Sequence, residues 1–150
     1  MPFAFRSAPD VRERLDLLGA GARFEACGPV YRGGPEAAQQ GPIYFATMRG
    51  GRSIPLLKVL LTDRCVGGCR YCAFRSSRDV CRTTLTPEEL ARTFDSMLSR
   101  DLVRGLFLSS GIDPDPVTSM DRMLDAAALV RRTFPGYVHL KILPGAEPAQ

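Results

Sequence analysis

The segment Pro55–Cys72 reads PLLKVLLTDRCVGGCRYC and decides the fold. Its first half, Pro55–Thr62, is a short and nearly continuous apolar run, which is typical of strands in parallel sheets covered on both faces. Its second half places Cys65, Cys69 and Cys72 directly after that strand, three and then two residues apart in the pattern Cys-x3-Cys-x2-Cys. The segment therefore predicts a buried strand that ends in a loop of metal-binding thiols.

The residues after this loop alternate between helical and strand patterns. Thr86-Pro87-Glu88-Glu89 opens a helix with a threonine cap, a proline in the first turn and a glutamate at the capping-box position. We expect a second strand at Leu106–Ser110, a helix at Met120–Phe134 and a third strand at Tyr137–Leu143. Alternation of this kind predicts an α/β fold in which parallel (β/α) units follow one another with right-handed crossovers.

The residues before Pro55 predict a short extension of helix and loop. Pro9–Leu18 has helical apolar spacing, and we expect Gly19 and Gly21 to end that helix. Residues 28–42 are rich in Gly, Pro and Gln and predict a loop, and Ile43–Met48 predicts an edge strand. The chain thus divides into an N-terminal extension, residues 1–54, and a core of about three βα units, residues 55–150.

Length, charge and hydropathy bound the class of protein. The 150 residues suffice for one domain with a modest core, and the formal charge is +4, carried almost entirely by arginine. Arginine excess is compatible with phosphate contact but does not by itself indicate DNA binding. No apolar run approaches the ~20 residues of a membrane span, and the N-terminus lacks the apolar core of a signal peptide. We expect a cytoplasmic protein without a membrane partner.

The cysteine run has the composition of an iron–sulfur site. Clusters are held by cysteine thiolates, and Gly67 and Gly68 allow the backbone to fold tightly around one. Arg64 and Arg70 add positive charge that offsets the thiolates. The alternative is a zinc site, to which Cys81, Cys27 or His139 would add a fourth ligand. A disulfide framework is not expected, because five cysteines is an odd number and no secretory signal precedes them.

A second set of candidate residues follows the second strand. Ser109, Ser110 and Gly111 stand at its C-terminal end, as the cysteines do at the end of the first strand, and βα folds build their sites at these ends. His139 and Lys141 share one face of the third strand, and the sequence leaves open whether that face points to a site or to solvent.

Two aspartates lie in the proline-rich loop that follows these small residues. Asp113 and Asp115 are interpreted as turn formers rather than as catalytic acids.

The pattern Cys-x3-Cys-x-aromatic-Cys, with Tyr71 at the aromatic position, resembles the signature of the radical S-adenosylmethionine (radical SAM) superfamily. The resemblance implies the first half of a partial TIM-type barrel. It implies a [4Fe–4S] cluster on Cys65, Cys69 and Cys72, whose open iron binds S-adenosylmethionine and, when reduced, cleaves it to a 5′-deoxyadenosyl radical. It also implies that Tyr71 lies against the adenine and that Ser109–Gly111 contacts the methionine amino group. The usual motif at the latter place is Gly-Gly-Glu, and this chain lacks the acidic residue.

Longer stretches are similar to one branch, the radical SAM proteins described as DNA modification or repair proteins. The stretches are Ala22–Cys27, Leu56–Thr62, Thr86–Leu90, Gly105–Ile112 and His139–Ala146. This resemblance implies a nucleic acid substrate, a uracil-DNA-glycosylase-like partner and a reducing electron donor of flavodoxin or ferredoxin type. Because cores of this superfamily have about six βα units, we expect the chain to be an N-terminal fragment whose own enzymatic activity is open. The alternative is a non-catalytic zinc- or iron–sulfur-binding module with Cys81 as the fourth ligand.

Overall fold

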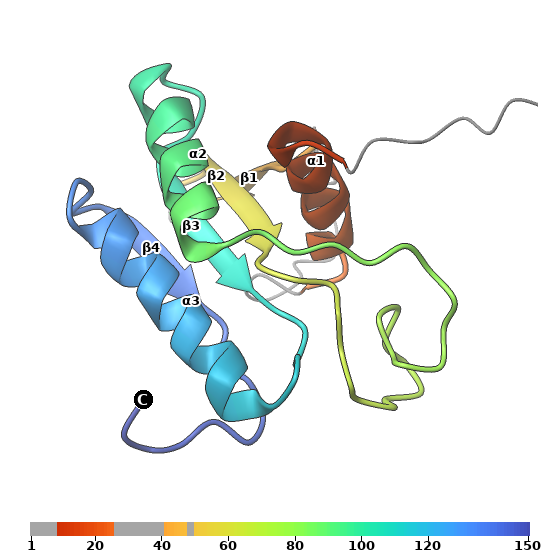
Figure 1. Ribbon diagram of the computed structural model, residues 1–150. Helices are drawn as coiled ribbons and strands as arrows, with labels where there is room; N and C mark the ends of the chain where they lie inside the picture. Colours follow the sequence, from red (N-terminus) through yellow and green to blue (C-terminus); the bar gives the residue numbers. More distant parts are fainter. Residues whose placement is uncertain (1–8, 26–40, 48–49) are drawn as a thin grey trace, which may run out of the picture.

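The strands of the chain form one sheet in the order β1-β2-β3-β4 (Figure 1). A computed structural model describes residues 9–25, 41–47 and 50–150. In chain order the elements are α1 (Val11–Ala22), β1 (Ile43–Thr47), β2 (Ser53–Leu60), α2 (Pro87–Ser99), β3 (Gly105–Ser109), α3 (Pro116–Arg131) and β4 (Tyr137–Leu140).

The sheet is mixed. β2, β3 and β4 run parallel, as the alternating pattern predicts, so the α/β class and the three parallel strands are confirmed. β1 lies at the edge of the sheet and pairs antiparallel with β2, so the edge strand predicted before the parallel units is confirmed. Gly50 and Gly51, both with positive φ, lie between the two strands, and a short turn of this kind can join only antiparallel neighbours. Because β2 begins at Ser53, the boundary expected after residue 54 falls inside this strand.

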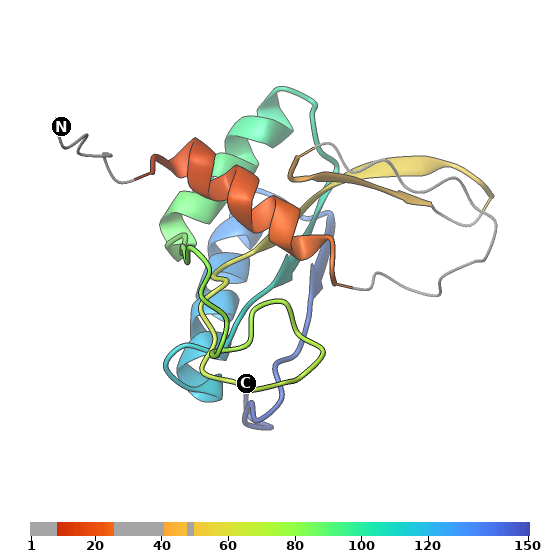
Figure 2. The ribbon, with the colours of Figure 1, turned by 90° about the vertical axis from the view of Figure 1, so that its right-hand side faces the viewer.

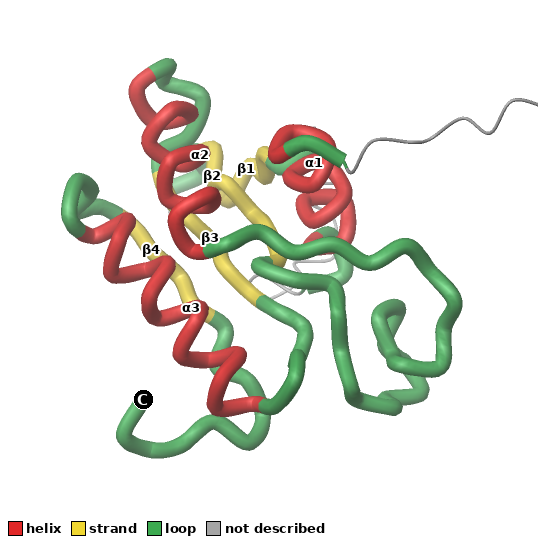
Figure 3. Tube along the Cα trace, in the orientation of Figure 1, coloured by secondary structure: helices red, strands yellow, loops and turns green. Residues whose placement is uncertain are grey.

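One apolar core joins the helices to the sheet. α2 packs against α3, and α1 packs against β2 (Figures 1 and 3). Phe94 of α2 is fully buried, and its ring meets the ring of Phe134 edge to face at 5.0 Å. Leu18 of α1 and Leu106 of β3 belong to the same buried cluster. The described part of the N-terminal extension therefore shares the core of the βα units.

The two glycines of α1 allow close packing against neighbouring residues and do not end the helix. The helix continues through Gly19 and Gly21 to Ala22, so the predicted end at Leu18 is wrong. A Cβ on Gly19 would lie 2.6 Å from the Cα of Pro42, and one on Gly21 would lie 3.0 Å from the ring of Phe74. Both glycines are buried, and they let the helix approach its neighbours closely.

The caps explain where α2 and α3 begin. Thr86 and Glu89 form the predicted capping box at the start of α2. α3 begins at Pro116, four residues before the predicted Met120, because the side chain of Asp115 accepts hydrogen bonds from the amide and hydroxyl of Thr118. These bonds hold the pKa of Asp115 below its ordinary value. Asp115 is thus a helix cap.

β4 is the edge strand beside β3 and is shorter than predicted. It ends at Leu140, three residues before the expected Leu143. Val138 and Leu140 pack against the core, and His139 points to the other face, as the alternation predicts. No helix in the described part of the chain is both long and apolar enough to cross a bilayer.

Candidate functional site

Residues 64–82, here called the cysteine loop, leave the sheet at the C-terminal end of β2 and return to the start of α2 (Figures 1 and 2). The two ends of the loop are joined at a neck. The amide of Leu85 donates to the carbonyl of Leu61 at 2.9 Å, and Thr62 pairs with Thr84 in an isolated bridge. This neck fixes where the thiols sit relative to the strand ends.

A buried carboxylate reinforces the neck. Asp63 is only 7% exposed, and its Oδ1 accepts a hydrogen bond from the amide of Thr83 at 2.7 Å. Burial raises the pKa of Asp63 above its ordinary value, while the Thr83 bond and the positive charges of Arg82 and Arg64 act in the opposite direction.

Arg82 holds the interior of the loop together. Its Nη1 donates to the carbonyl oxygens of Asp63 at 2.6 Å and Phe74 at 2.9 Å. Its Nη2 donates to the carbonyl oxygens of Arg75 at 2.9 Å and Arg78 at 3.3 Å. One planar guanidinium thus gathers backbone from both ends and the middle of the loop, which a lysine ammonium cannot reproduce in the same geometry.

The backbone also turns toward the thiols. The amide of Gly67 donates to Sγ of Cys65, and the amide of Phe74 donates to Sγ of Cys72, both at 3.4 Å. A Cβ on Gly67 would lie 3.3 Å from Sγ of Cys65 and 3.9 Å from Sγ of Cys69, so both sulfurs border the space that this glycine leaves open. N–H···S hydrogen bonds and a glycine between sulfurs suit thiolates bound to an iron–sulfur cluster, because they compensate charge and leave room.

A cavity of about 210 Å³ lies where the cysteine loop meets the ends of the parallel strands. Three groups of residues line it. Cys65, Tyr71, Cys72 and Phe74 come from the loop, Ser109–Ile112 form the end of β3 and the turn after it, and Lys141–Pro144 follow β4; Glu25 and Leu60 complete the lining. The tertiary structure therefore brings together two of the three candidate ligands, the candidate aromatic residue and all three small residues.

An ion pair stands at this cavity. Lys141 Nζ is paired with the carboxylate of Glu25. The backbone carbonyl of Glu25 also accepts a hydrogen bond at 2.6 Å from Lys58, a buried cation on β2. The cavity thus combines thiols, hydroxyls and one paired cation.

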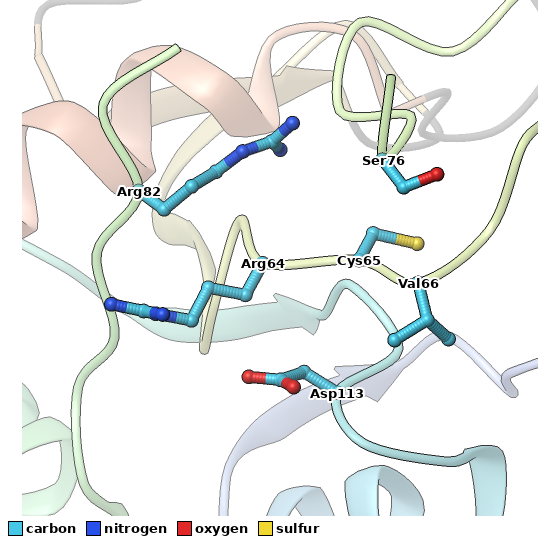
Figure 4. A pocket seen from close by; sticks show the side chains of 6 residues that line it. All are labelled: Arg64, Cys65, Val66, Ser76, Arg82 and Asp113. Carbon is cyan, nitrogen blue, oxygen red and sulfur yellow. The ribbon is translucent and has the colours of Figure 1, made fainter. Parts of the chain in front are cut away.

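A second cavity, of about 250 Å³, lies on another side of Cys65. Arg82 and Asp113 stand on opposite sides of this space in Figure 4, with Arg64 and Cys65 between them. Val66 and Ser76 complete its lining. Cys65 therefore borders both cavities.

The remaining candidates lie outside the two cavities or, for Tyr71, at the exposed border of one. Cys69 and Cys81 are exposed and line neither cavity, and Cys27 lies outside the described residues. Tyr71 borders the first cavity but is 94% exposed. His139 lies outside both cavities and stacks on Phe107 at 4.7 Å between ring centroids.

Some residues of this site have no signal in the sequence that we recognised. Arg82 is one of five arginines in the loop, and nothing in its spacing distinguishes the one that binds four carbonyls. Glu25 is another: Lys141 was a candidate, but nothing in the sequence indicates that its partner is a glutamate more than a hundred positions away. Only folding brings these groups together.

Within residues 9–25, 41–47 and 50–150, no three His, Cys, Asp or Glu side chains converge on a position for a single metal ion. A cubane cluster takes one thiolate on each iron, so its ligands need not converge in this way. Comparison of the chain with models of protein families, with curated proteins and with solved structures found no match.

Proposed function

We propose that the chain holds a [4Fe–4S] cluster on Cys65, Cys69 and Cys72 and binds S-adenosylmethionine in the cavity beside it, as radical SAM proteins do. The observation that carries this proposal is the first cavity, which joins Cys65 and Cys72 to Ser109–Gly111 at one edge of the sheet. Parallel βα folds place ligands at this edge. When bound and reduced, such a cluster supplies the electron that cleaves the sulfonium of S-adenosylmethionine.

The chain's own residues would bind and orient these groups. The amides of Gly67 and Phe74 would stabilise the metal-bound thiolates of Cys65 and Cys72. The hydroxyls of Ser109 and Ser110 would face the polar end of the ligand. At about 210 Å³ the cavity is smaller than the ~300–1,000 Å³ typical of small-molecule pockets, so bound S-adenosylmethionine would extend beyond it.

The role in DNA modification or repair belongs to the same proposal and rests on the sequence resemblance. It makes nucleic acid the substrate class and a uracil-DNA-glycosylase-like protein a partner. Binding of the reconstituted chain to a fluorescent DNA duplex tests this part separately. Absence of binding would remove the DNA role and leave the cluster proposal standing.

The deciding experiment is electron paramagnetic resonance on the anaerobically reconstituted, reduced chain, with and without S-adenosylmethionine. We expect a four-iron signal that changes when S-adenosylmethionine is added. Cys65→Ala, Cys69→Ala and Cys72→Ala should each abolish the signal, while Cys81→Ala serves as the matched control and should retain it. Loss of metal in Cys81→Ala, or zinc in place of iron in the wild type, would favour the four-cysteine binding module instead.

A further inference from the structure

The second cavity is separate from the one to which the proposed function assigns S-adenosylmethionine. The two cavities share only Cys65 among their lining residues, and neither Cys69 nor Cys72 borders the second. Its volume of about 250 Å³ is several times the ~30 Å³ that one water occupies in the liquid, which leaves room for a small ligand. The proposed function leaves this cavity without a role.

Hydrogen bonds fix the backbone around this cavity. The amide of Val66 donates to the carbonyl of Ile112 at 2.8 Å, which joins the cysteine loop to the segment after β3. The amide of Asp113 donates to a hydroxyl of α3 at 2.8 Å. The amide of Ser76 donates to the carbonyl of Gly67, also at 2.8 Å. Because the lining residues are already held in place, a ligand pays little for ordering them.

The two arginines of the lining differ in what they can offer a ligand. Both terminal nitrogens of Arg82 are held by carbonyl oxygens, so its guanidinium is a positive charge in a fixed position. Arg64 is exposed, and its guanidinium forms no hydrogen bond or ion pair with any described residue. Arg64 can therefore donate to a ligand through N–H groups that the fold does not use.

The carboxylate of Asp113 is also unused by the fold. The main chain of Asp113 is bonded to Ser119 and Arg122 of α3, but its side chain forms no hydrogen bond or ion pair with any described residue. An aspartate that forms a turn or cap bonds its carboxylate to nearby amides, as Asp115 does. In Figure 4 the Asp113 carboxylate and the Arg64 guanidinium extend toward the same side of the view, yet they are not paired. A cation and an anion that line one cavity without pairing suit a ligand that both accepts and donates hydrogen bonds.

We infer that the second cavity binds a phosphate group that carries a proton, as inorganic phosphate or the terminal phosphate of a monoester does. Arg64 and the hydroxyl of Ser76 donate to its oxygens, and Arg82 supplies fixed positive charge. Asp113 accepts the hydrogen bond of the P–OH group. Two arginines against one carboxylate make the lining favour an anion over a cation or a neutral ligand.

Asp113 determines which oxyanions this cavity accepts. A phosphate monoester retains a proton for much of the time near pH 6, because its second pKa is about 6. Sulfate and phosphodiesters carry no proton under these conditions, so their oxygens would meet the Asp113 carboxylate as like charges. The cavity should therefore reject both sulfate and the phosphodiester backbone of a nucleic acid.

The test is isothermal titration calorimetry of the anaerobically reconstituted full chain at about pH 6, where phosphate retains its proton. The probes are inorganic phosphate, sulfate and dimethyl phosphate, a diester that has no P–OH group. We expect phosphate to bind roughly tenfold or more tightly than either of the other two.

Two variants with matched controls test the assigned residues. Asp113→Asn keeps the size of the side chain and removes its charge, so sulfate should bind more tightly and the phosphate-to-sulfate ratio should fall to within about twofold. Asp79→Asn, exposed in the same loop and outside the cavity, should keep the wild-type ratio. Arg64→Ala should weaken phosphate binding roughly tenfold, and Arg78→Ala, also exposed and outside the cavity, should leave it within about twofold.

Three results would overturn the inference: no phosphate binding to the wild type, equal affinities for phosphate and sulfate, or an unchanged ratio in Asp113→Asn. A gain of sulfate binding in Asp113→Asn cannot come from misfolding. Glycerol 3-phosphate as a further probe separates the two sources of the group, because tighter binding than inorganic phosphate supports a monoester and weaker binding supports the free ion. The proposed function fails separately, when the wild type shows no four-iron signal, and titration of the chain as purified then tests this cavity alone.

Discussion

The βα core and the cysteine loop are stabilised in different ways. The core is held by buried apolar side chains such as Phe94, Leu106 and Met123, which are at most 1% exposed. The loop has no regular helix or strand, and hydrogen bonds to backbone carbonyls of the loop and its neck hold it, four of them from Arg82. The burial of apolar side chains has no preferred direction, so the core tolerates repacking. The loop depends on individual hydrogen-bond donors, each of which must lie in a defined direction. Substitutions should therefore separate global stability from the order of the site.

Phe94→Ala should have the largest effect on global stability. The ring is fully buried and packs edge to face with Phe134, so its loss should lower the free energy of unfolding by about 3–5 kcal/mol. Urea denaturation followed by circular dichroism measures this change. Leu102→Ala, at a side chain that is 41% exposed, is the control and should shift stability by less than about 1 kcal/mol. Equal effects would mean that the apolar core does not dominate stability.

Gly111→Ala should damage the junction of core and loop. A Cβ at this position would lie 2.0 Å from the carbonyl oxygen of Arg64, so the backbone next to Cys65 must move. We expect a loss of about 1–3 kcal/mol and a large loss of iron incorporation. Gly68→Ala is the matched control in the metal-free chain, because a Cβ there meets nothing within 4 Å. Equal melting temperatures for the two variants would show that the junction is not rigid.

Arg82→Lys should loosen the loop and leave the core intact. The lysine keeps the charge but cannot reach four carbonyls in the same plane. We expect about tenfold faster tryptic cleavage within the loop of the metal-free chain, equivalent to ~1.4 kcal/mol, with global unfolding little changed. Arg78→Lys, whose side chain is exposed, should cleave at the wild-type rate. If Arg82→Lys lowered global stability by as much as it loosened the loop, the loop and the core would unfold together as one cooperative unit.

Loss of the Glu89 carboxylate should have the smallest effect on stability. The direction of its pH dependence follows from the shift of the Glu89 pKa. Arg14 pairs with Glu89 and also donates to the carbonyl of Thr84 at the neck of the loop. The Arg14 hydrogen bond holds the pKa of Glu89 below its ordinary value of 4.5. The unfolded chain therefore protonates Glu89 more readily than the folded chain does. The ion pair stabilises the fold fully at pH values above the unfolded-state pKa of Glu89, and this stabilisation is lost as the pH falls through the lower folded-state pKa.

Glu89→Gln should remove this pH dependence and about 0.5–1 kcal/mol of stability at neutral pH. The glutamine can still complete the capping box with Thr86, so helix initiation is preserved. Thermal unfolding between pH 3 and 7 tests this, with the exposed neighbour Glu88→Gln as control. An unchanged pH profile in Glu89→Gln would mean that the ion pair does not link α1 to the loop neck.

Local sequence signals were reliable where the interaction is local. The apolar run at Pro55–Thr62 became a buried parallel strand, and the Thr86 capping box began α2 where it was expected. The start of α3 was predicted four residues late, because the Asp115 cap was interpreted as a turn. The end of α1 was missed, because Gly19 and Gly21 look like breakers in sequence but are required by close contacts with Pro42 and Phe74.

The sequence by itself determined the α/β class, the order of the strands along the chain and the position of three thiols after a strand, because apolar periodicity, caps and motif spacing are properties of neighbouring residues. Only the tertiary structure decided that β1 pairs antiparallel with β2, and that Glu25 and Lys141 line the cavity beside Cys65 and Cys72. It also decided that Arg82, among five arginines, holds the loop. These features depend on contacts between residues distant in sequence, which no local pattern encodes.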